Sequence, residues 1–348
     1  MPQKAVVITG SKQVSLVSDR PLPTLRDDYI LIKTVCVALN PTDWKHVEYD
    51  FGAPGCVVGC DYSGIVEEVG KNVKKSFRKG DRVFGFTHGS NAVQPEDGCF
   101  AEYIVAKGDL QMHIPDSLSF QDAATLGVGI STVGQGLYQS LKLALPTESI
   151  SQPEPILIYG GSTATGSLAI QYAKLSGYHV LTTCSLHNFD LVKKLGADAA
   201  WDYRDDSSAA EIRAATNDSL RLAFDTISLD NSAQFCDHAL STKGGEYSNL
   251  LDSKIDRGNV NSRATLGYTV IGEAFQIHNL KFPAIPEDRE FGEMFWKLSE
   301  PLIAEGKIKV HPPKVCADGL EGVLHGMQLL KEGRVSGQKL VYNVAETP

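Results

Sequence analysis

One stretch decides the fold: Ile156-Leu-Ile-Tyr159, then Gly160-Gly-Ser-Thr-Ala-Thr-Gly166, then an apolar-periodic helix. A buried strand that enters a glycine-rich turn and then a helix presents backbone N–H groups and a helix N-terminus to a pyrophosphate. Gly161 and Gly166 occupy the first and third positions of a G-x-G-x-x-G pattern, and Thr163 occupies the middle one. In this context the turn predicts dinucleotide binding, and a plain loop is the alternative.

The sequence around this turn changes character twice. Residues 1–115 contain short β-branched or aromatic runs separated by Gly, Pro and Asp, which predicts a small irregular β-barrel. After residue 150, strands and helices alternate with short connections, which is typical of a doubly wound parallel sheet. The expected elements there are strands at 156–159, 179–184, 220–226, 246–250 and 265–271, and helices at 164–176 and 188–195.

The tail has mixed character. It contains an amphipathic stretch at 288–304, a helix at 320–331 and a last strand at 339–344, which can pair back with the first region. We therefore expect an α/β chain with a β-rich catalytic domain at 1–119, a nucleotide domain at 120–275 and a returning segment at 276–348.

Composition excludes several classes of protein. The 348 residues include 33 Lys and Arg against 42 Asp and Glu, so the formal net charge is −9 and no nucleic-acid partner is expected. There is no apolar run of bilayer length and no secretory leader pattern, so we expect a cytoplasmic protein with no membrane partner. Seven scattered cysteines without a CxxC pair indicate reduced thiols.

The end of the second strand of the α/β part predicts which dinucleotide is bound. NAD sites place Asp or Glu there, whereas this chain reads Thr183-Cys-Ser-Leu-His-Asn188. Ser185, His187 and Asn188 can donate hydrogen bonds to a 2′-phosphate, and no carboxylate repels it. The prediction is NADP(H); the simpler reading of Asn188 is a helix N-cap.

Several short motifs carry a family resemblance. Asn40-Pro-Thr-Asp43, Gly59-Cys-Asp-Tyr-Ser-Gly64 and Gly80-Asp-Arg-Val83, in this order of domains, resemble the medium-chain dehydrogenase/reductase superfamily over essentially the whole chain. Gly127-Val-Gly-Ile-Ser-Thr132 and the 183–190 segment are similar to fungal trans-acting enoyl reductases of polyketide synthases. The resemblance implies a GroES-like β-rich catalytic domain joined to a Rossmann-type doubly wound parallel sheet.

The same resemblance bears on metal binding. The positions that hold catalytic zinc in alcohol dehydrogenases of the superfamily match Asn40, Cys60 and Val128. An amide and a valine are poor zinc ligands, so we expect no metal. The chemistry implied is hydride transfer from NADPH to the β-carbon of an enoyl thioester, with donors for the developing enolate.

The resemblance assigns roles to named residues. The loop after Asn40 carries Lys45, the expected catalytic residue, which would bind the ribose, supply a proton or polarise the thioester; an ordinary surface lysine is the alternative. Tyr62 is a second candidate donor. Cofactor contacts are expected from Pro41, Thr42, Asp43, Trp44, Ser162, Thr163, Ala164, Thr165, Ser185, Leu186, His187, Asn188, Tyr203, Leu250, Val335 and Ser336. Substrate contacts are expected from Gly127, Val128, Gly129, Ile130, Ser131, Thr132, Val133, Gly134, Gly272, Glu273, Ala274, Phe275 and Gln276.

The expected function is an NADPH-dependent enoyl reductase that works in trans on a chain held by the acyl carrier protein of a polyketide synthase. A quinone or free-enone reductase and an NADPH-binding protein without catalysis are the alternatives. The basic run at 71–79 either docks the acidic carrier protein or is a solvated turn. The resemblance favours a monomer over a homodimer.

Overall fold

The computed structural model describes residues 2–348, which form two compact units. The first unit contains residues 2–128 and 268–348, and the second contains residues 129–267. The second unit thus lies within the nucleotide domain expected at 120–275.

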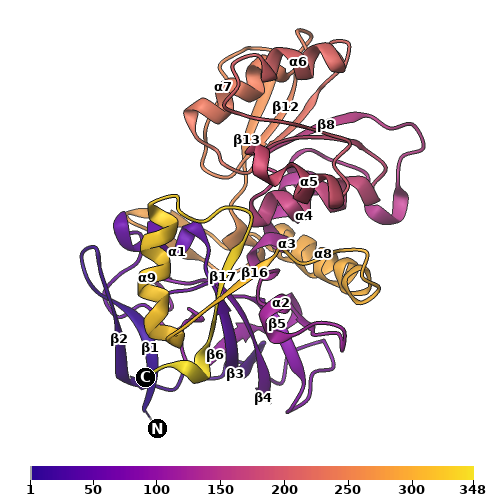
Figure 1. Ribbon diagram of the computed structural model, residues 1–348. Helices are drawn as coiled ribbons and strands as arrows, with labels where there is room; N and C mark the ends of the chain where they lie inside the picture. Colours follow the sequence, from indigo (N-terminus) through magenta and orange to yellow (C-terminus); the bar gives the residue numbers. More distant parts are fainter. Residues whose placement is uncertain (1) are drawn as a thin grey trace. The chain divides into compact units, whose positions relative to one another are not determined.

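The first unit is built on a mixed sheet in the order β16-β17-β3-β4-β5-β7, with β6 also pairing with β3. Strand β17 runs antiparallel to β3, so the chain's last strand does return to the first region, as Figure 1 shows. A hairpin of β1 and β2 and a small hairpin of β14 and β15 complete its strands among the described residues. Their bounds are Pro2–Gly10 (β1), Gln13–Pro21 (β2), Tyr29–Ala38 (β3), Asp61–Val69 (β4), Arg82–Phe86 (β5), Tyr103–Lys107 (β6), Gln111–His113 (β7), Phe275–Ile277 (β14), Leu280–Phe282 (β15), Pro313–Cys316 (β16) and Lys339–Asn343 (β17).

The helices of the first unit are α1 (Pro41–Glu48), α2 (Phe120–Ala123), α8 (Pro286–Ala304) and α9 (Gly319–Lys331). Helices α1 and α9 lie side by side and are joined by an ion pair between Lys331 and Glu48 at 2.7 Å (Figure 1). The segment after Asn40 is therefore a helix rather than the expected loop. Pro41 supplies the first helical φ, and Asp43 Oδ2 accepts a 2.6 Å bond from the Asn40 N–H.

The second unit is a six-stranded sheet in the order β10-β9-β8-β11-β12-β13, and each pairing between neighbours is parallel. The strands are β8 (Pro155–Tyr159), β9 (His179–Thr183), β10 (Ala199–Trp201), β11 (Leu222–Asp225), β12 (Gly245–Asn249) and β13 (Val260–Ala264). Its helices are α4 (Ala164–Leu175), α5 (Phe189–Lys194), α6 (Ser208–Ala215) and α7 (Asp230–Ala239); α3 (Gly127–Val133) spans the boundary between the units. The strand order reverses at β8, and this switch point is where Rossmann-type sheets bind nucleotides.

The prediction of a strand at 265–271 is wrong. The edge strand is β13, and residues Gly267–Ile271 form a 3-10 helix whose residues 268–271 are buried. In β13 only Val260 is buried, because an edge strand exposes most of its side chains, so the strand has no apolar run to detect.

Candidate active site

The glycine-rich turn has the geometry that a phosphate requires. A Cβ on Gly166 would lie 2.2 Å from the Gly160 carbonyl oxygen, and one on Gly161 would lie 2.1 Å from Thr182 Oγ1. Thr163 caps helix α4 by accepting a 2.9 Å bond from the Gly166 N–H. Only glycine permits this close approach, and residues 162–165 at the start of helix α4 are partly exposed, so the residues fit a pyrophosphate.

The segment after β9 carries the three donors expected for the cofactor, of which His187 is exposed, Ser185 is partly buried and Asn188 is buried. Leu186–Asn188 form a short 3-10 helix that begins after Ser185, and Leu186 is well exposed. A carboxylate that sequence reasoning overlooked, Asp202, lies close enough to His187 for that ring to lower the Asp202 pKa, although Arg204 contributes more. Arg204 binds both oxygens of Asp202 at 3.0 Å, which balances its charge.

Two further expected cofactor residues lie in the second unit. Tyr203 is 42% exposed, and the Arg204 guanidinium lies 5.5 Å from its ring centroid, so one ring face already has a cationic neighbour. Leu250 follows β12, and its N–H donates a 2.7 Å bond to Ser228 Oγ. Beside it, at the carboxyl ends of β11 and β12, lies a hollow of about 570 Å³.

Helix α1 presents Lys45 and Thr42 on one face, because they are three residues apart. Both are partly buried, and loss of solvent lowers the pKa of Lys45. The Lys45 ammonium lies 5.8 Å from the centroid of Trp44, another expected cofactor residue. The exposed Pro41 begins the helix, whereas the Asp43 side chain turns inward.

A polar cluster lies beneath Thr42. Its hydroxyl is 2.8 Å from Tyr268 Oη and 3.0 Å from His46 Nδ1, and Tyr268 Oη is 3.5 Å from Cys60 Sγ. The His88 ring stacks on Tyr268 with centroids 3.8 Å apart. Sequence reasoning did not find Tyr268, His46 or His88, because no motif or periodicity relates them to Thr42.

Burial sets the protonation of this cluster. Loss of solvent raises the pKa of Cys60 and Tyr268 well above their usual values and that of Asp43 to about 7. It lowers the pKa of His46 and His88. Except for Asp43, which titrates near neutrality, these groups are uncharged at neutral pH.

The positions that match zinc ligands are used differently here. Asn40 Nδ2 donates to Asp61 Oδ2 at 2.9 Å, and Asn40 Oδ1 accepts from Lys339 Nζ at 2.9 Å. The Val128 N–H donates to the other Asp61 oxygen at 2.5 Å. Within residues 2–348, no group of three or more His, Cys, Asp and Glu side chains could hold a metal. These residues do not fit zinc, and Lys339 Nζ places a positive charge at Asp61.

The first expected substrate segment, Gly127–Gly134, is closely packed. A Cβ on Gly127 would lie 2.2 Å from the Gly85 carbonyl oxygen, and one on Gly129 would lie 2.6 Å from Leu168 Cδ1. Thr132 is 8% exposed. Close packing accounts for these glycines, and their contact with substrate stays a prediction.

The second expected substrate segment, Gly272–Gln276, is anchored inside the first unit. The Glu273 carboxylate accepts from Tyr29 Oη at 2.8 Å and from Lys107 Nζ at 2.5 Å. Phe275 is buried, stacks on Phe282 at 4.7 Å and meets the His88 ring edge at 4.9 Å. Glu273 thus acts as an anchor, and Phe275 adjoins the cluster of Tyr268.

The remaining cofactor residues of the tail, Val335 and Ser336, lie between α9 and β17. Val335 packs against the core of the first unit, and Ser336 is exposed. Tyr62 is fully buried and donates a 2.7 Å bond to Gln111 Oε1, so its proton is directed into the core.

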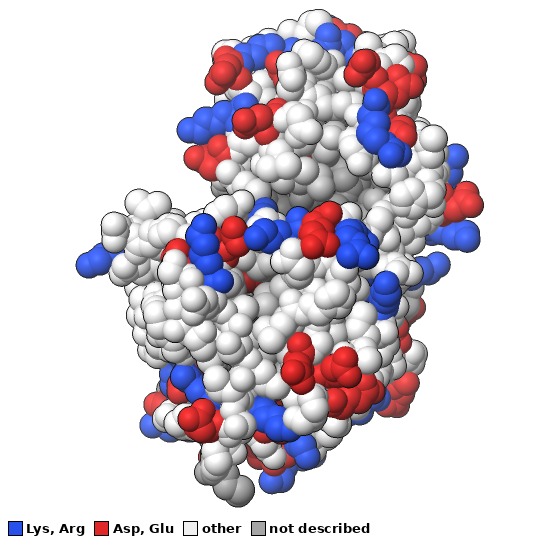
Figure 2. Space-filling view, turned by 60° about the vertical axis from the view of Figure 1, so that its left-hand side comes forward, with Lys and Arg blue, Asp and Glu red and all other residues white. Residues whose placement is uncertain are grey.

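The four lysines of the basic run at 71–79 are paired with carboxylates. Its lysines pair with carboxylates at 2.8–3.0 Å: Lys71 with Asp27, Lys74 with Glu293, Lys75 with Glu300 and Lys79 with Glu67. Figure 2 likewise shows Lys and Arg interspersed with Asp and Glu on the face in view. The pairing favours the solvated turn over a docking patch.

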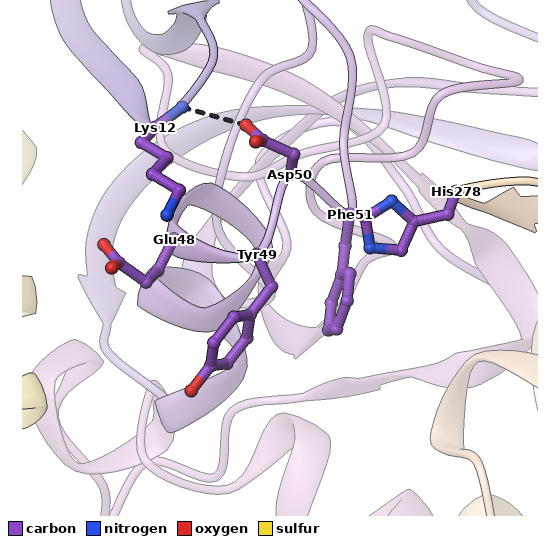
Figure 3. A pocket seen from close by; sticks show the side chains of 6 residues that line it. All are labelled: Lys12, Glu48, Tyr49, Asp50, Phe51 and His278. Atoms are coloured by element: carbon purple, nitrogen blue, oxygen red, sulfur yellow. Dashed lines mark hydrogen bonds between the residues drawn. The ribbon is translucent and has the colours of Figure 1, made fainter.

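A shallow hollow of about 510 Å³ lies at the end of helix α1 (Figure 3). The Phe51 and His278 rings meet there edge to face, with centroids 5.0 Å apart. The Lys12 N–H donates to Asp50 at 2.9 Å. The lining includes the Lys12 ammonium and the carboxylates of Glu48 and Asp50, so this hollow is not a selective binding site for an anionic ligand. Its lining residues are Lys12, Glu48, Tyr49, Asp50, Phe51 and His278.

Comparison with known proteins identifies the family. Residues 26–116 match the alcohol dehydrogenase GroES-like domain, and residues 164–247 match the zinc-binding dehydrogenase family. The trans-enoyl reductase TOXD of Cochliobolus carbonum is 62% identical over 84% of this chain and 98% of that protein. The chain belongs to the trans-enoyl reductase family. A second member, resD of Aspergillus sclerotiorum, is 49% identical over 98% of this chain and 100% of that protein.

Solved structures agree with the fold of this trans-enoyl reductase family member. The quinone oxidoreductase of Coxiella burnetii matches with a TM-score of 0.71 and 26% identity over 99% of this chain and 100% of that one. The CurK enoyl reductase matches with a TM-score of 0.77 over 98% and 99%, and its 18% identity indicates the fold alone. The predicted superfamily, fold class, enzyme class and use of a nicotinamide cofactor are confirmed. No helix in residues 2–348 has the length and hydropathy needed to cross a membrane.

Proposed function

We propose that this chain is an NADPH-dependent enoyl reductase that acts in trans on the α,β-unsaturated thioester of a polyketide chain, held by the acyl carrier protein of a partner synthase. The observation that carries the proposal is the similarity over nearly the full length to trans-enoyl reductases. The turn at Gly160–Gly166, which fits a pyrophosphate, supports it.

The proposed choice of NADPH rests on the segment after β9. Ser185, His187 and Asn188 carry hydrogen-bond donor groups at the start of a helix, and one carboxylate near His187, Asp202, is paired with Arg204. A 2′-phosphate bound at this segment would meet donor groups, and the charge of Asp202 beside it is balanced. The exposed ring of Tyr203 offers a face for adenine.

The reaction needs a hydride, a proton and a stabilised enolate. A bound reduced nicotinamide supplies the hydride to the β-carbon. Lys45 is the proposed catalytic residue, because its partly buried ammonium can donate to the developing enolate oxygen and its lowered pKa eases proton release. Substrate contacts are proposed separately for Thr132 in the second unit and for Phe275 in the first, and both side chains are buried.

A second candidate has one specific observation in its favour. The quinone oxidoreductase of Coxiella burnetii shares 26% identity and the whole fold with this chain. A quinone or free-enone reductase would use the same cofactor site on small diffusible substrates. We place the enoyl thioester first, because the relatives named trans-enoyl reductases are much more similar to this chain.

Turnover with defined substrates tests the proposal. NADPH oxidation is measured with enoyl thioesters on a carrier protein, with the same thioesters on free pantetheine, and with quinones. The proposal expects the highest kcat/KM for the carrier-bound enoyl chain and a monomer by light scattering. A preference for quinones supports the second candidate, and tight NADPH binding without any oxidation indicates a protein that has lost catalysis.

A further inference from the structure

A row of hydrogen-bonding groups runs from the surface of the first unit into its interior. Thr42 is partly exposed at one end, whereas Tyr268 and Cys60 are 7% and 1% exposed. Tyr268 Oη lies between them, 2.8 Å from Thr42 Oγ1 and 3.5 Å from Cys60 Sγ. Thr42 is the most exposed member of the row, so it is the end that a bound molecule can reach.

The position of the His46 proton sets the direction of the hydrogen bond between His46 and Thr42. His46 Nδ1 is 2.8 Å from the Thr42 carbonyl oxygen and 3.0 Å from Thr42 Oγ1, and Nε2 is buried without a hydrogen-bond partner. A carbonyl only accepts, so Nδ1 carries the proton and Nε2 carries none. Burial lowers the pKa of His46, which keeps the ring neutral. The Thr42 hydroxyl therefore accepts from His46 and does not donate to it.

The single proton of the Tyr268 hydroxyl bears on the direction of the hydrogen bond between Tyr268 and Thr42. Burial raises the Tyr268 pKa far above its ordinary value, so the group stays a phenol with one proton to donate. Thr42 Oγ1 at 2.8 Å is a much better acceptor than the Cys60 sulfur at 3.5 Å. Either hydroxyl can donate across the 2.8 Å contact, and the weakness of sulfur as an acceptor favours the arrangement in which Tyr268 donates to Thr42 and the Thr42 proton points away from both buried neighbours.

We propose that Tyr268 is a positioning residue for the cofactor: its hydroxyl fixes the Thr42 hydroxyl as a donor directed out of the unit, toward a ribose oxygen of NADPH. This inference rests on the proposed function, which makes Thr42 part of the cofactor site. The ring of Tyr268 has an anchor of its own, because it stacks on His88 with an interplanar angle of 6°. The ring does not depend on the Tyr268 hydroxyl to hold its place, so that hydroxyl can orient Thr42.

A double-mutant cycle tests this proposal through NADPH affinity, measured by fluorescence titration of the full chain. Tyr268→Phe and Thr42→Val each remove one hydroxyl and keep the shape of the side chain. Each is expected to raise the Kd by about tenfold, because Thr42→Val removes the donor to the cofactor and Tyr268→Phe removes the contact that orients that donor. The double variant is expected to match the single ones, because Tyr268 acts only through Thr42. Thr42→Ser is expected to restore the affinity.

The matched control is Tyr247→Phe, which removes a buried hydroxyl that donates to Asp225 at 2.8 Å in the second unit. It is expected to lower the melting temperature without changing the Kd. The proposal is overturned if Tyr268→Phe leaves the Kd unchanged, or if the two single effects multiply in the double variant. If the unaltered chain does not bind NADPH, the proposed function fails and this inference fails with it.

Discussion

Lys339 and Asp61 form an ion pair whose side chains are 2% and 0% exposed. The pair joins the last strand β17 to β4, and Asn40 bonds to both partners at 2.9 Å. It thereby ties the returning tail to the residue at the start of helix α1.

Loss of this pair is expected to destabilise the first unit strongly. Lys339→Met leaves the Asp61 carboxylate buried without its cation, which costs about 3–5 kcal/mol in such sites. Denaturant unfolding measures the change. Lys331→Met is the matched control, because it breaks an exposed pair with Glu48 and should leave the midpoint nearly unchanged. Equal effects of the two variants contradict this account.

His311 predicts an acid limit to stability. It is 1% exposed, and burial, aided by Lys339, lowers its pKa to about 4. The unfolded chain binds a proton near pH 6.5 and the folded chain does not, so stability is complete above pH 6.5 and falls as the pH drops toward 4. His311→Gln removes this dependence. The free energy of unfolding of the wild type, relative to the variant, is expected to fall by up to about 3 kcal/mol between pH 7.5 and pH 4. A constant difference contradicts the assignment.

The glycine-rich turn predicts a specific loss of cofactor binding. Gly166→Ala places a methyl group 2.2 Å from the Gly160 carbonyl oxygen, so the turn must open and its N–H groups shift. The Kd of NADPH is expected to rise at least about tenfold in titration. Gly258→Ala is the control, because nothing lies within 4 Å of its Cβ position. If Gly166→Ala binds NADPH with an unchanged Kd, the pyrophosphate does not bind at this turn.

The proposed 2′-phosphate site predicts how selectivity can be altered. Ser185→Asp introduces a carboxylate at the end of β9, where it would repel a 2′-phosphate and accept from a ribose hydroxyl. The ratio of the NADPH Kd to the NADH Kd is expected to rise by about tenfold or more. Ser219→Asp, at an exposed position with its own backbone contact, serves as the charge control. If the ratio of the two Kd values is the same in Ser185→Asp and Ser219→Asp, the 2′-phosphate does not bind near Ser185.

The parallel sheet and its glycine-rich turn were predictable from the sequence. Local signals specify them, because the turn glycines adjoin an apolar strand and a periodic helix. The return of β17 to β3 followed from an apolar strand left over after the α/β part. Helix α1 was missed because its polar residues resemble a loop until Asn40, Pro41 and Asp43 are read together as a cap.

The buried cluster was beyond reach of the sequence. Tyr268 lies 226 residues after Thr42, and their contact depends on the return of the chain to the first unit at residue 268. The pairing of Lys74 and Lys75 has the same cause, because their partners Glu293 and Glu300 come from helix α8, far along the chain. Long-range pairing of this kind leaves no local periodicity to read.

The central claim is that this chain passes a hydride from NADPH to an enoyl thioester carried by a partner. The most direct measurement is NADPH oxidation with a carrier-bound enoyl chain, for the unaltered protein and for Lys45→Met, with the saturated product identified by mass spectrometry. We expect turnover of the carrier-bound chain to exceed turnover of quinones, and kcat to fall about a hundredfold or more in Lys45→Met. An unaltered protein that leaves the double bond intact while it reduces quinones would contradict the central claim.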